Sequence, residues 1–145
     1  MKHPLRKIMV ATDGSDPSMR AAEMAIEIAH HYGAELLAVH VVDEEVLREF
    51  CRALGKDEEQ ARETLAADAE KYLQEIRVLA EHKVRIATMV DHGTPHEALV
   101  TIAQKEKADL IVMGKIGRRG PRRVLMGSVT QRVIDLAEVP VLVVK

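Results

Sequence analysis

Short apolar runs alternate with longer amphipathic stretches along the chain. Runs of β-branched and aliphatic residues predict strands, and stretches with apolar positions three or four residues apart predict helices. We expect strands at residues 8–12, 36–42, 84–90, 110–113 and 141–144. The resulting order, β-α-β-α-β-α-β-α-β, predicts an α/β fold in which residues 1–145 form one domain and right-handed crossovers join parallel strands.

Capping residues set the expected helix boundaries. Asp16 is expected to cap the first helix, with Pro17 at its first helical position, and Gly33 is expected to end it. Residues 94–97 and 128–131 each have the form of a capping box, in which Ser or Thr precedes Glu or Gln by three positions. We therefore expect two further helices to begin at these boxes.

The remaining segments differ in regularity. Residues 57–82 form a long helical pattern with one apolar side, whereas residues 43–56 are less regular and are expected to form a mobile excursion. Residues 36–42 are almost wholly apolar, which is typical of a strand buried on both faces. Residues 84–90 alternate more strongly between apolar and polar side chains, and so predict an edge strand.

Composition narrows the class of protein. Hydrophobic residues make up 47% of the 145 residues, which excludes a disordered chain, and only 2% are aromatic, so the core is expected to be aliphatic. The net charge of −2 gives no overall attraction to nucleic acid or to an anionic membrane, and no apolar run approaches the roughly 18 residues of a membrane span. The single cysteine, Cys51, cannot form an internal disulfide. We expect a soluble cytoplasmic protein without a membrane or nucleic-acid partner.

The segment after the fourth expected strand points to phosphate chemistry. Ligands of open parallel sheets bind beyond the carboxyl ends of the strands, where loops usually run about 2–6 residues. The loop from Gly114 to Gly127 is much longer, contains Lys115 and four arginines, and leads into a helix that begins near Ser128. Glycines let the backbone approach a ligand closely, and the N–H groups at a helix N-terminus favour anions. The loop therefore predicts phosphate binding, although Ser128 also suits an ordinary N-cap.

A family resemblance follows from the spacing of these glycines. Gly114, Gly117, Gly127 and Ser128 match the pattern Gly-x2-Gly-x9-Gly-Ser/Thr, which is the nucleotide-binding motif of the universal stress protein family. The likeness extends over the full chain, and further matching segments lie at residues 10–15, 40–43, 93–95, 127–130 and 140–145. The chain resembles the ATP-binding branch of this family. The resemblance implies a flavodoxin-like, Rossmann-like open sheet of five parallel strands in the order 3-2-1-4-5, with helices on both faces.

The resemblance also implies roles for individual residues. The phosphates would be held by the glycine loop and the start of the following helix, at Gly117, Gly127, Ser128, Val129 and Thr130. Val41 would pair with the adenine edge through its backbone. The adenosine would be faced by Ala11, Thr12 and Asp13, with Met113 and Gly114 beneath it. In this arrangement Asp13 belongs on ribose hydroxyls, on the base or on a bound Mg²⁺, because a carboxylate repels phosphates; its alternative role is to organise the turn before the first helix.

The implied ligand is ATP, with AMP, ADP and a cyclic nucleotide as alternatives and Mg²⁺ as an accompanying ion. The function implied is that of an ATP-binding regulator or sensor in a stress response, in which ATP occupancy sets the shape of residues 43–56 and 115–126. A slow ATP hydrolase acting as a molecular switch and a nucleotide-free interaction module are the alternatives. No catalytic residue is assigned, because the Walker lysine motif is absent and only Asp43 offers a carboxylate for slow turnover. The seven histidines do not show metal-ligand spacing, so no protein metal site is expected.

The last expected strand predicts a partner. In the order 3-2-1-4-5 this strand lies at an edge, yet residues Val139 to Val144 are apolar on both faces. An exposed edge of this kind pairs readily with another chain. We therefore expect a homodimer joined through this strand, as the resemblance also implies.

Overall fold

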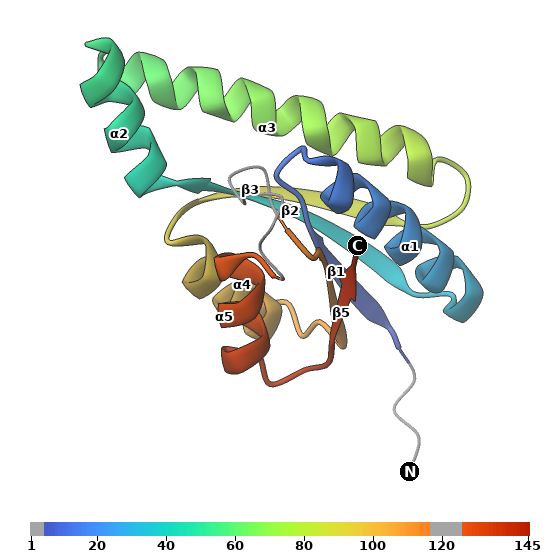
Figure 1. Cartoon of the computed structure of the whole chain (residues 1–145). Coiled ribbons are helices and arrows are strands. Elements are labelled where there is room, and N and C mark those ends of the chain that lie inside the picture. The colour runs from blue at the N-terminus through green and yellow to red at the C-terminus, as the bar shows by residue number, and fades with distance from the viewer. Residues whose placement is uncertain (1–4, 117–125) are drawn as a thin grey trace.

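The computed structural model describes residues 5–116 and 126–145. Its sheet has five parallel strands in the order β3-β2-β1-β4-β5, which confirms the expected fold class and strand order (Figure 1). The strands are β1 (Lys7–Ala11), β2 (Glu35–Asp43), β3 (Ile86–Gly93), β4 (Leu110–Gly114) and β5 (Val141–Val144). The strands β3 and β5 form the two edges of the sheet.

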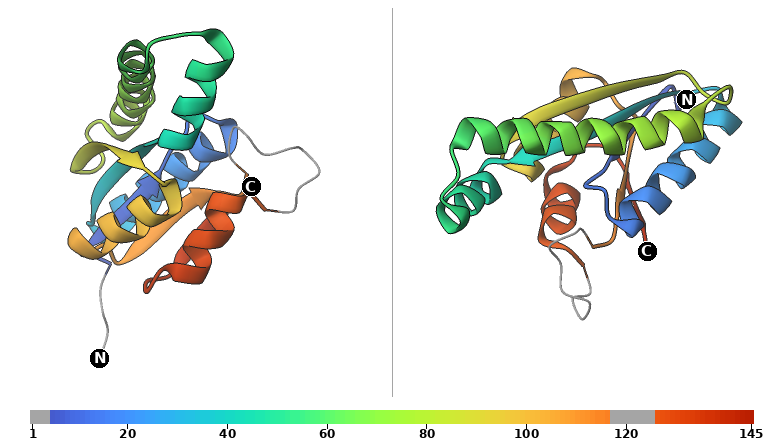
Figure 2. Two further views of the ribbon diagram at one scale, coloured as in Figure 1. Left: turned by 90° about the vertical axis from the view of Figure 1, so that its left-hand side faces the viewer. Right: turned by 90° about the horizontal axis from the view of Figure 1, so that it is seen from above.

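Helices cover both faces of the sheet. On one face lie α1 (Asp16–Tyr32) and α3 (Glu58–Ala80), and on the other lie α4 (Pro95–Lys105) and α5 (Ser128–Leu136). The short helix α2 (Glu44–Leu54) stands beyond the carboxyl end of β2, and α3 runs back from it along β2 and β3 (Figures 1 and 2). Within the described ranges, no helix is both long and apolar enough to cross a membrane.

Alternation along the central strand supplies both cores. Ile8 and Val10 of β1 pack beneath α1 and α3, whereas Met9 packs beneath α4 and α5. All three side chains are 0% exposed, as expected for the middle strand of a sheet covered on both faces. The cores are aliphatic, in agreement with the composition. They hold β1, β2 and β4 side by side, so that the carboxyl ends of these strands lie together at one end of the sheet.

The segment 43–56 was wrongly expected to be irregular. It contains α2, whose N-cap Asp43 accepts hydrogen bonds from Glu45 N (3.0 Å) and Val46 N (3.3 Å), and whose C-cap Gly55 is left-handed. Leu47 and Cys51 lie one turn apart on this helix and pack against Ala61 of α3. The helix is therefore held by a small core of its own with α3.

Three capping predictions also need correction. The N-cap of α1 is Ser15, whose Oγ accepts a hydrogen bond from Ser18 N (3.3 Å), and Asp16 is the first helical residue. Gly33 ends the helix in a left-handed conformation, as expected. Thr94 is the N-cap of α4 but makes no side-chain capping bond, and Gly127 rather than Ser128 is the N-cap of α5. Neither expected capping box is formed.

A smaller difference concerns the bounds of one strand. The third strand lies at 86–93 instead of 84–90, although its expected position at the edge of the sheet is confirmed. Leu79 on α3 and Ile134 on α5 are 39% and 40% exposed.

Candidate functional site

The first feature of the site is the early end of β1. Its ladder with β2 ends at the pair Ala11 and Val39, and Thr12 N then donates a hydrogen bond to Val39 O (2.9 Å). β2 continues to Asp43 and β4 continues to Gly114. The chain winds from β1 to β2 and β3 on one side, and the connection through α4 then crosses to β4 and β5 on the other side. The winding direction therefore reverses between β1 and β4, which is where open α/β sheets bind ligands.

Backbone groups of β2 face the gap beyond the end of β1. Val39 O points to β1, and Leu36 N points to β3, where it donates to Arg85 O (2.9 Å). Because both polar groups of a residue in a parallel strand point to the same side and alternate along the chain, the N–H and C=O of Val41 point to the β1 side. β1 has already left the sheet at this level, so Val41 offers one donor and one acceptor there.

The turn from β1 to α1 is held by its own side chains. Thr12 Oγ1 accepts from Gly14 N (3.2 Å) and lies 3.1 Å from Ser18 Oγ, while Asp13 Oδ1 accepts from Ser15 N (3.0 Å). Asp13 therefore performs the turn-organising role that the sequence left open as the alternative. Thr12 is buried, so its side chain supports the turn from within.

Two aromatic rings support the same turn, and sequence reasoning missed both. Gly14 has a φ of 81°, and a Cβ at this position would lie 2.5 Å from the ring of Tyr72 on α3. His40 Nδ1–H donates to Thr12 O (2.8 Å), and its ring lies 5.9 Å from that of Tyr72. Tyr72 sits at a helical spacing typical of core residues, which conceals its contact with the turn.

The two ends of the glycine loop lie together. Gly127 N donates to Lys115 O (2.8 Å), and Thr130 Oγ1 donates to Gly114 O (2.9 Å). Lys115 N donates in turn to Val144 O of β5 (2.7 Å). These bonds place the N-terminus of α5 directly beside the carboxyl end of β4. Gly117 and the arginines at 118–123 lie outside the described residues.

Gly114 has a structural role independent of any ligand. A Cβ at this position would lie 2.9 Å from both Pro17 C and Ser18 N, which are backbone atoms of the first turn of α1. The side chain of Met113 is only 5% exposed and packs in the core beneath α4 and α5. The placement of these two residues beneath the adenosine, which the resemblance implied, stays a prediction.

The electrostatics of α5 differ from those of the other described helices. The other helices each carry acidic residues in the first turn, where they favour the helix dipole: Asp16, Glu44 with Glu45, Glu58 with Glu59, and Glu97. The first turn of α5 carries no acidic residue, and no side-chain cap bond forms at Gly127. Ser128 is exposed there, Val129 is half-buried and Thr130 is buried. This N-terminus is electrostatically suited to an anion.

The helix α2 is tied to the end of β3 by one carboxylate. Glu44 Oε1 accepts a hydrogen bond from Arg62 of α3 and lies 3.8 Å from Nδ1 of His92. The Arg62 guanidinium holds the pKa of Glu44 below its usual value, although partial burial acts in the opposite direction. Across residues 5–116 and 126–145, no group of three or more His, Cys, Asp or Glu side chains could hold a metal ion.

Comparison with known proteins identifies the family. The model of the Universal stress protein family matches residues 4–145. The chain belongs to the universal stress protein family. It is 42% identical over 142 residues to the universal stress protein MJ0531 of Methanocaldococcus jannaschii, covering 97% of this chain and 82% of that protein.

Solved structures agree with this assignment. The structure of MJ0577 from the same organism matches this universal stress protein with a TM-score of 0.86 at 29% identity, covering 99% of this chain and 97% of that one. A universal stress protein crystallised in complex with cAMP matches with a TM-score of 0.73 at 28% identity, covering 99% and 98% of the two chains. The resemblance stated from the sequence is confirmed, together with the fold that it implied.

Proposed function

We propose that this universal stress protein binds an adenine nucleotide, with ATP as the preferred ligand, beyond the carboxyl ends of β1 and β4. We further propose that it acts as a single-domain regulator or sensor in a cytoplasmic stress response. The observation that carries the proposal is the position and charge of the N-terminus of α5. The Gly127–Lys115 and Thr130–Gly114 hydrogen bonds hold it beside the end of β4, and its first turn contains no acidic residue. A family member of the same fold was crystallised with cAMP, an adenine nucleotide.

The phosphate end of the ligand fits this helix. The N–H groups of Ser128, Val129 and Thr130 belong to the first turn of α5, where backbone donors and the helix dipole favour an anion. Gly127 precedes them, and the Ser128 hydroxyl is exposed in the same turn. We assign the phosphates to these four residues and to Gly117.

The adenosine end fits the neighbouring strand ends. The backbone N–H and C=O of Val41 match the acceptor and donor on the adenine edge. Ala11, Thr12 and Asp13 follow the end of β1 and would face the adenosine, with Met113 and Gly114 beneath it. Mg²⁺ usually binds through phosphate oxygens, waters and one or two carboxylates, so an accompanying ion would need only Asp13 from these residues.

The first test is to denature the purified protein and identify any released nucleotide by chromatography and mass spectrometry. Release of about one ATP per chain supports the proposal, and release of AMP or ADP supports the site with a different preference. The same protein is then titrated with ATP, ADP, AMP and cAMP, because a ligand at a hundred times its Kd stabilises the folded state by about 2.7 kcal/mol. No release and no thermal shift with any of them would overturn the proposal.

A charge placed at the helix N-terminus separates binding from folding. Ser128→Asp adds a carboxylate that the α5 dipole favours, so the ligand-free protein should keep or gain stability, by about 0.3–1 kcal/mol. The same carboxylate repels phosphate, so ATP binding should be lost. Ser128→Asn is the neutral control of similar size and should bind more tightly than Ser128→Asp. Equal ATP affinity in the two variants would contradict phosphate binding at α5.

Hydrolysis is tested separately. Steady ATP turnover that disappears in Asp13→Ala would favour the hydrolase hypothesis over a regulator that only binds. Asp43 contributes little to that hypothesis, because its carboxylate caps α2.

We also propose a homodimer joined through Val139–Val144. All four residues of the edge strand β5 are partly exposed, and the apolar Ile134 and Leu136 on α5 are 40% and 52% exposed. A second copy would cover this apolar surface and satisfy the open strand edge. Sedimentation at micromolar concentration should give the mass of a dimer, and a monomer there would exclude it.

A further inference from the structure

The ladder between β1 and β2 stops at a defined hydrogen bond. Thr12 N donates to Val39 O (2.9 Å). A residue in a parallel ladder donates to one residue of the neighbouring strand and accepts from the residue two positions further along it, so the next bond would run from Val41 N to Thr12 O. That bond is not formed in the part of the chain that the structure describes. The Thr12 carbonyl is directed to a different donor.

The imidazole of His40 takes the place of the Val41 amide. His40 Nδ1 lies 2.8 Å from Thr12 O, and because a carbonyl oxygen only accepts, the ring carries a proton on Nδ1. Leu36 and Ala38 of β2 pack beneath α1 and α3, so by alternation the side chain of His40 lies on the same face. The Thr12 carbonyl is thus drawn toward α3 and away from the Val41 N–H, which lies in the plane of the sheet.

The helix α3 holds both partners of this bond in place. The ring of Tyr72 lies 5.9 Å from that of His40, at an interplanar angle of 51°. The same ring lies against Gly14, where a Cβ would come within 2.5 Å of it. Tyr72 therefore supports the imidazole and the turn that carries Thr12 together.

We propose that His40 is a positioning residue for the base: by occupying the Thr12 carbonyl, it keeps the Val41 N–H available to a ring nitrogen of adenine. This inference rests on the proposed nucleotide site and states how its base contact is kept open. Without the imidazole, the partly buried Thr12 carbonyl would turn to the Val41 N–H and continue the ladder by one bond, because an unsatisfied carbonyl is unfavourable. The Val41 C=O would still accept from the adenine amino group, but the donor would be lost.

Two substitutions of similar size separate the hydrogen bond from the ring. Asparagine carries Nδ2 on Cγ, as histidine carries Nδ1, so His40→Asn can keep the bond to Thr12 O. His40→Leu places a methyl group at that position. Both variants lose the contact with the Tyr72 ring, so a difference between them reports the hydrogen bond.

Amide hydrogen exchange of the nucleotide-free protein, followed by NMR, tests the diversion without any ligand. In the unmodified protein and in His40→Asn, we expect the Val41 amide to exchange much faster than that of Val39, which the ladder bonds to β1. In His40→Leu the Val41 amide should become protected by a factor on the order of tenfold or more. A Val41 amide that exchanges equally in all three proteins would refute the inference, whether or not nucleotide binds.

Binding of ATP analogues tests the consequence for the base. The analogues 1-deaza-ATP and 7-deaza-ATP each lack one of the ring nitrogens beside the amino group, so one of them removes the acceptor for the Val41 N–H. We expect the unmodified protein to bind that analogue on the order of tenfold more weakly than ATP, which corresponds to one hydrogen bond. His40→Leu should bind ATP more weakly by a similar factor and the analogue no worse than ATP. His40→Asn should retain the preference of the unmodified protein.

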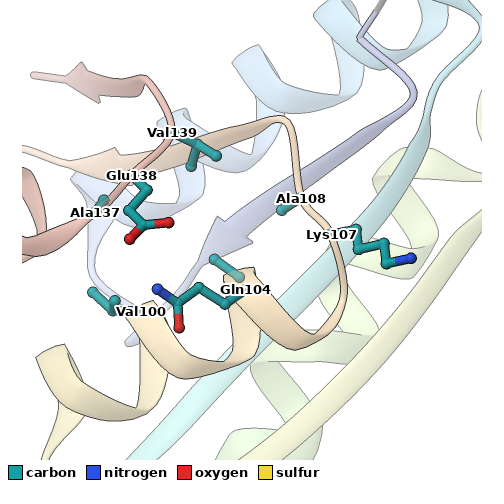
Figure 3. A pocket seen from close by; sticks show the side chains of 8 residues that line it. Val100, Gln104, Lys107, Ala108, Ala137, Glu138 and Val139 are labelled. Carbon is teal, nitrogen blue, oxygen red and sulfur yellow. The ribbon is translucent and has the colours of Figure 1, made fainter.

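Gln104→Leu is the matched control, because it also replaces a polar side chain by leucine. Gln104 lies in the last turn of α4, and its side chain points into a groove between α4 and the turn from α5 to β5 (Figure 3). This groove lies at the amino ends of β4 and β5, away from the carboxyl ends of the strands. The control should change neither the ATP affinity nor the exchange of the Val41 amide.

The outcomes separate this inference from the proposed function. Absence of nucleotide binding by the unmodified protein would refute the proposed site, and with it the role of His40 in base recognition. An unmodified protein that binds ATP and both analogues equally, or a His40→Leu variant that keeps the full preference for ATP, would refute the role of His40 and leave the nucleotide site standing. Loss of the preference in His40→Leu with its retention in His40→Asn supports the inference.

Discussion

Replacing Gly114 by alanine tests how closely the end of β4 packs against the first turn of α1. The added Cβ would lie 2.9 Å from Pro17 C and from Ser18 N. Favourable contacts between such atoms begin near 3.5 Å, so β4 and the first turn of α1 must separate by roughly 0.6 Å. No side-chain rotation relieves this contact, because both atoms belong to the backbone.

The cost follows from what the first turn of α1 holds. Ser18 Oγ donates to Ser15 O (2.8 Å) and lies 3.1 Å from Thr12 Oγ1, so a shift of this turn strains buried hydrogen bonds as well as packing. Overpacking of a well-packed core costs about 1–3 kcal/mol. A chain of this length loses roughly 3–4 °C in Tm per kcal/mol, so we expect a decrease of roughly 3–12 °C.

The assay is urea and thermal unfolding of nucleotide-free protein. Gly55→Ala is the comparison, because a Cβ there meets no atom within 4 Å and only its φ of 62° is unfavourable, which costs about 1–2 kcal/mol. Unchanged stability of nucleotide-free Gly114→Ala would refute the packing argument. Unchanged stability combined with weaker ATP binding would show that this glycine serves the ligand instead.

Three further sets of substitutions test contacts around the candidate site. Gly14→Ala should lower the free energy of unfolding by about 1–2 kcal/mol from its positive φ alone. The double variant with Tyr72→Ala should lose less stability than the sum of the two single variants, which a double-mutant cycle by urea unfolding would measure. Thr130→Val removes the donor to the Gly114 carbonyl and should cost about 1–3 kcal/mol in urea unfolding, whereas Thr130→Ser should retain most of it. Glu44→Gln should be less stable than the unmodified protein above pH 4.5, because the folded pKa of Glu44 is lowered; the difference should vanish as pH falls through that lower pKa. A difference that persisted in acid would exclude the ion pair as its cause.

The pattern of apolar residues along the chain made most of the fold predictable. The strands at residues 36–42 and 110–113 are dense apolar runs that no other element explains, and both were found within two residues of their expected ends. The helix α2 was missed although Leu47, Phe50, Cys51 and Leu54 follow one another at helical spacing. Its own sequence therefore contained the signal, and the expectation of an irregular segment overlooked it.

Cap positions were less predictable for a local reason. Ser15 and Asp16 are both good N-caps, and the choice between them depends on the backbone angles of the preceding turn. Ser128 likewise has the residue type of a cap, but Gly127 takes that position because Thr130 turns inward to Gly114. The predicted start of a helix is therefore uncertain by one residue wherever two adjacent residues are both suitable N-caps.

The candidate site combines chemistry that sequence can indicate with directions that only the fold supplies. Glycine spacing pointed to the loop, but Gly114 is constrained by Pro17, which lies nearly a hundred positions earlier in the chain. The aliphatic side chain of Val41 offers no hydrogen-bonding group or charge that would mark this residue as a ligand contact in the sequence. Its proposed contact with adenine rests on the end of β1 at Ala11, because the Val41 backbone groups then face a place without a strand. Because that property belongs to the pairing of two strands, substituting the Val41 side chain by another β-branched residue should leave nucleotide recognition intact.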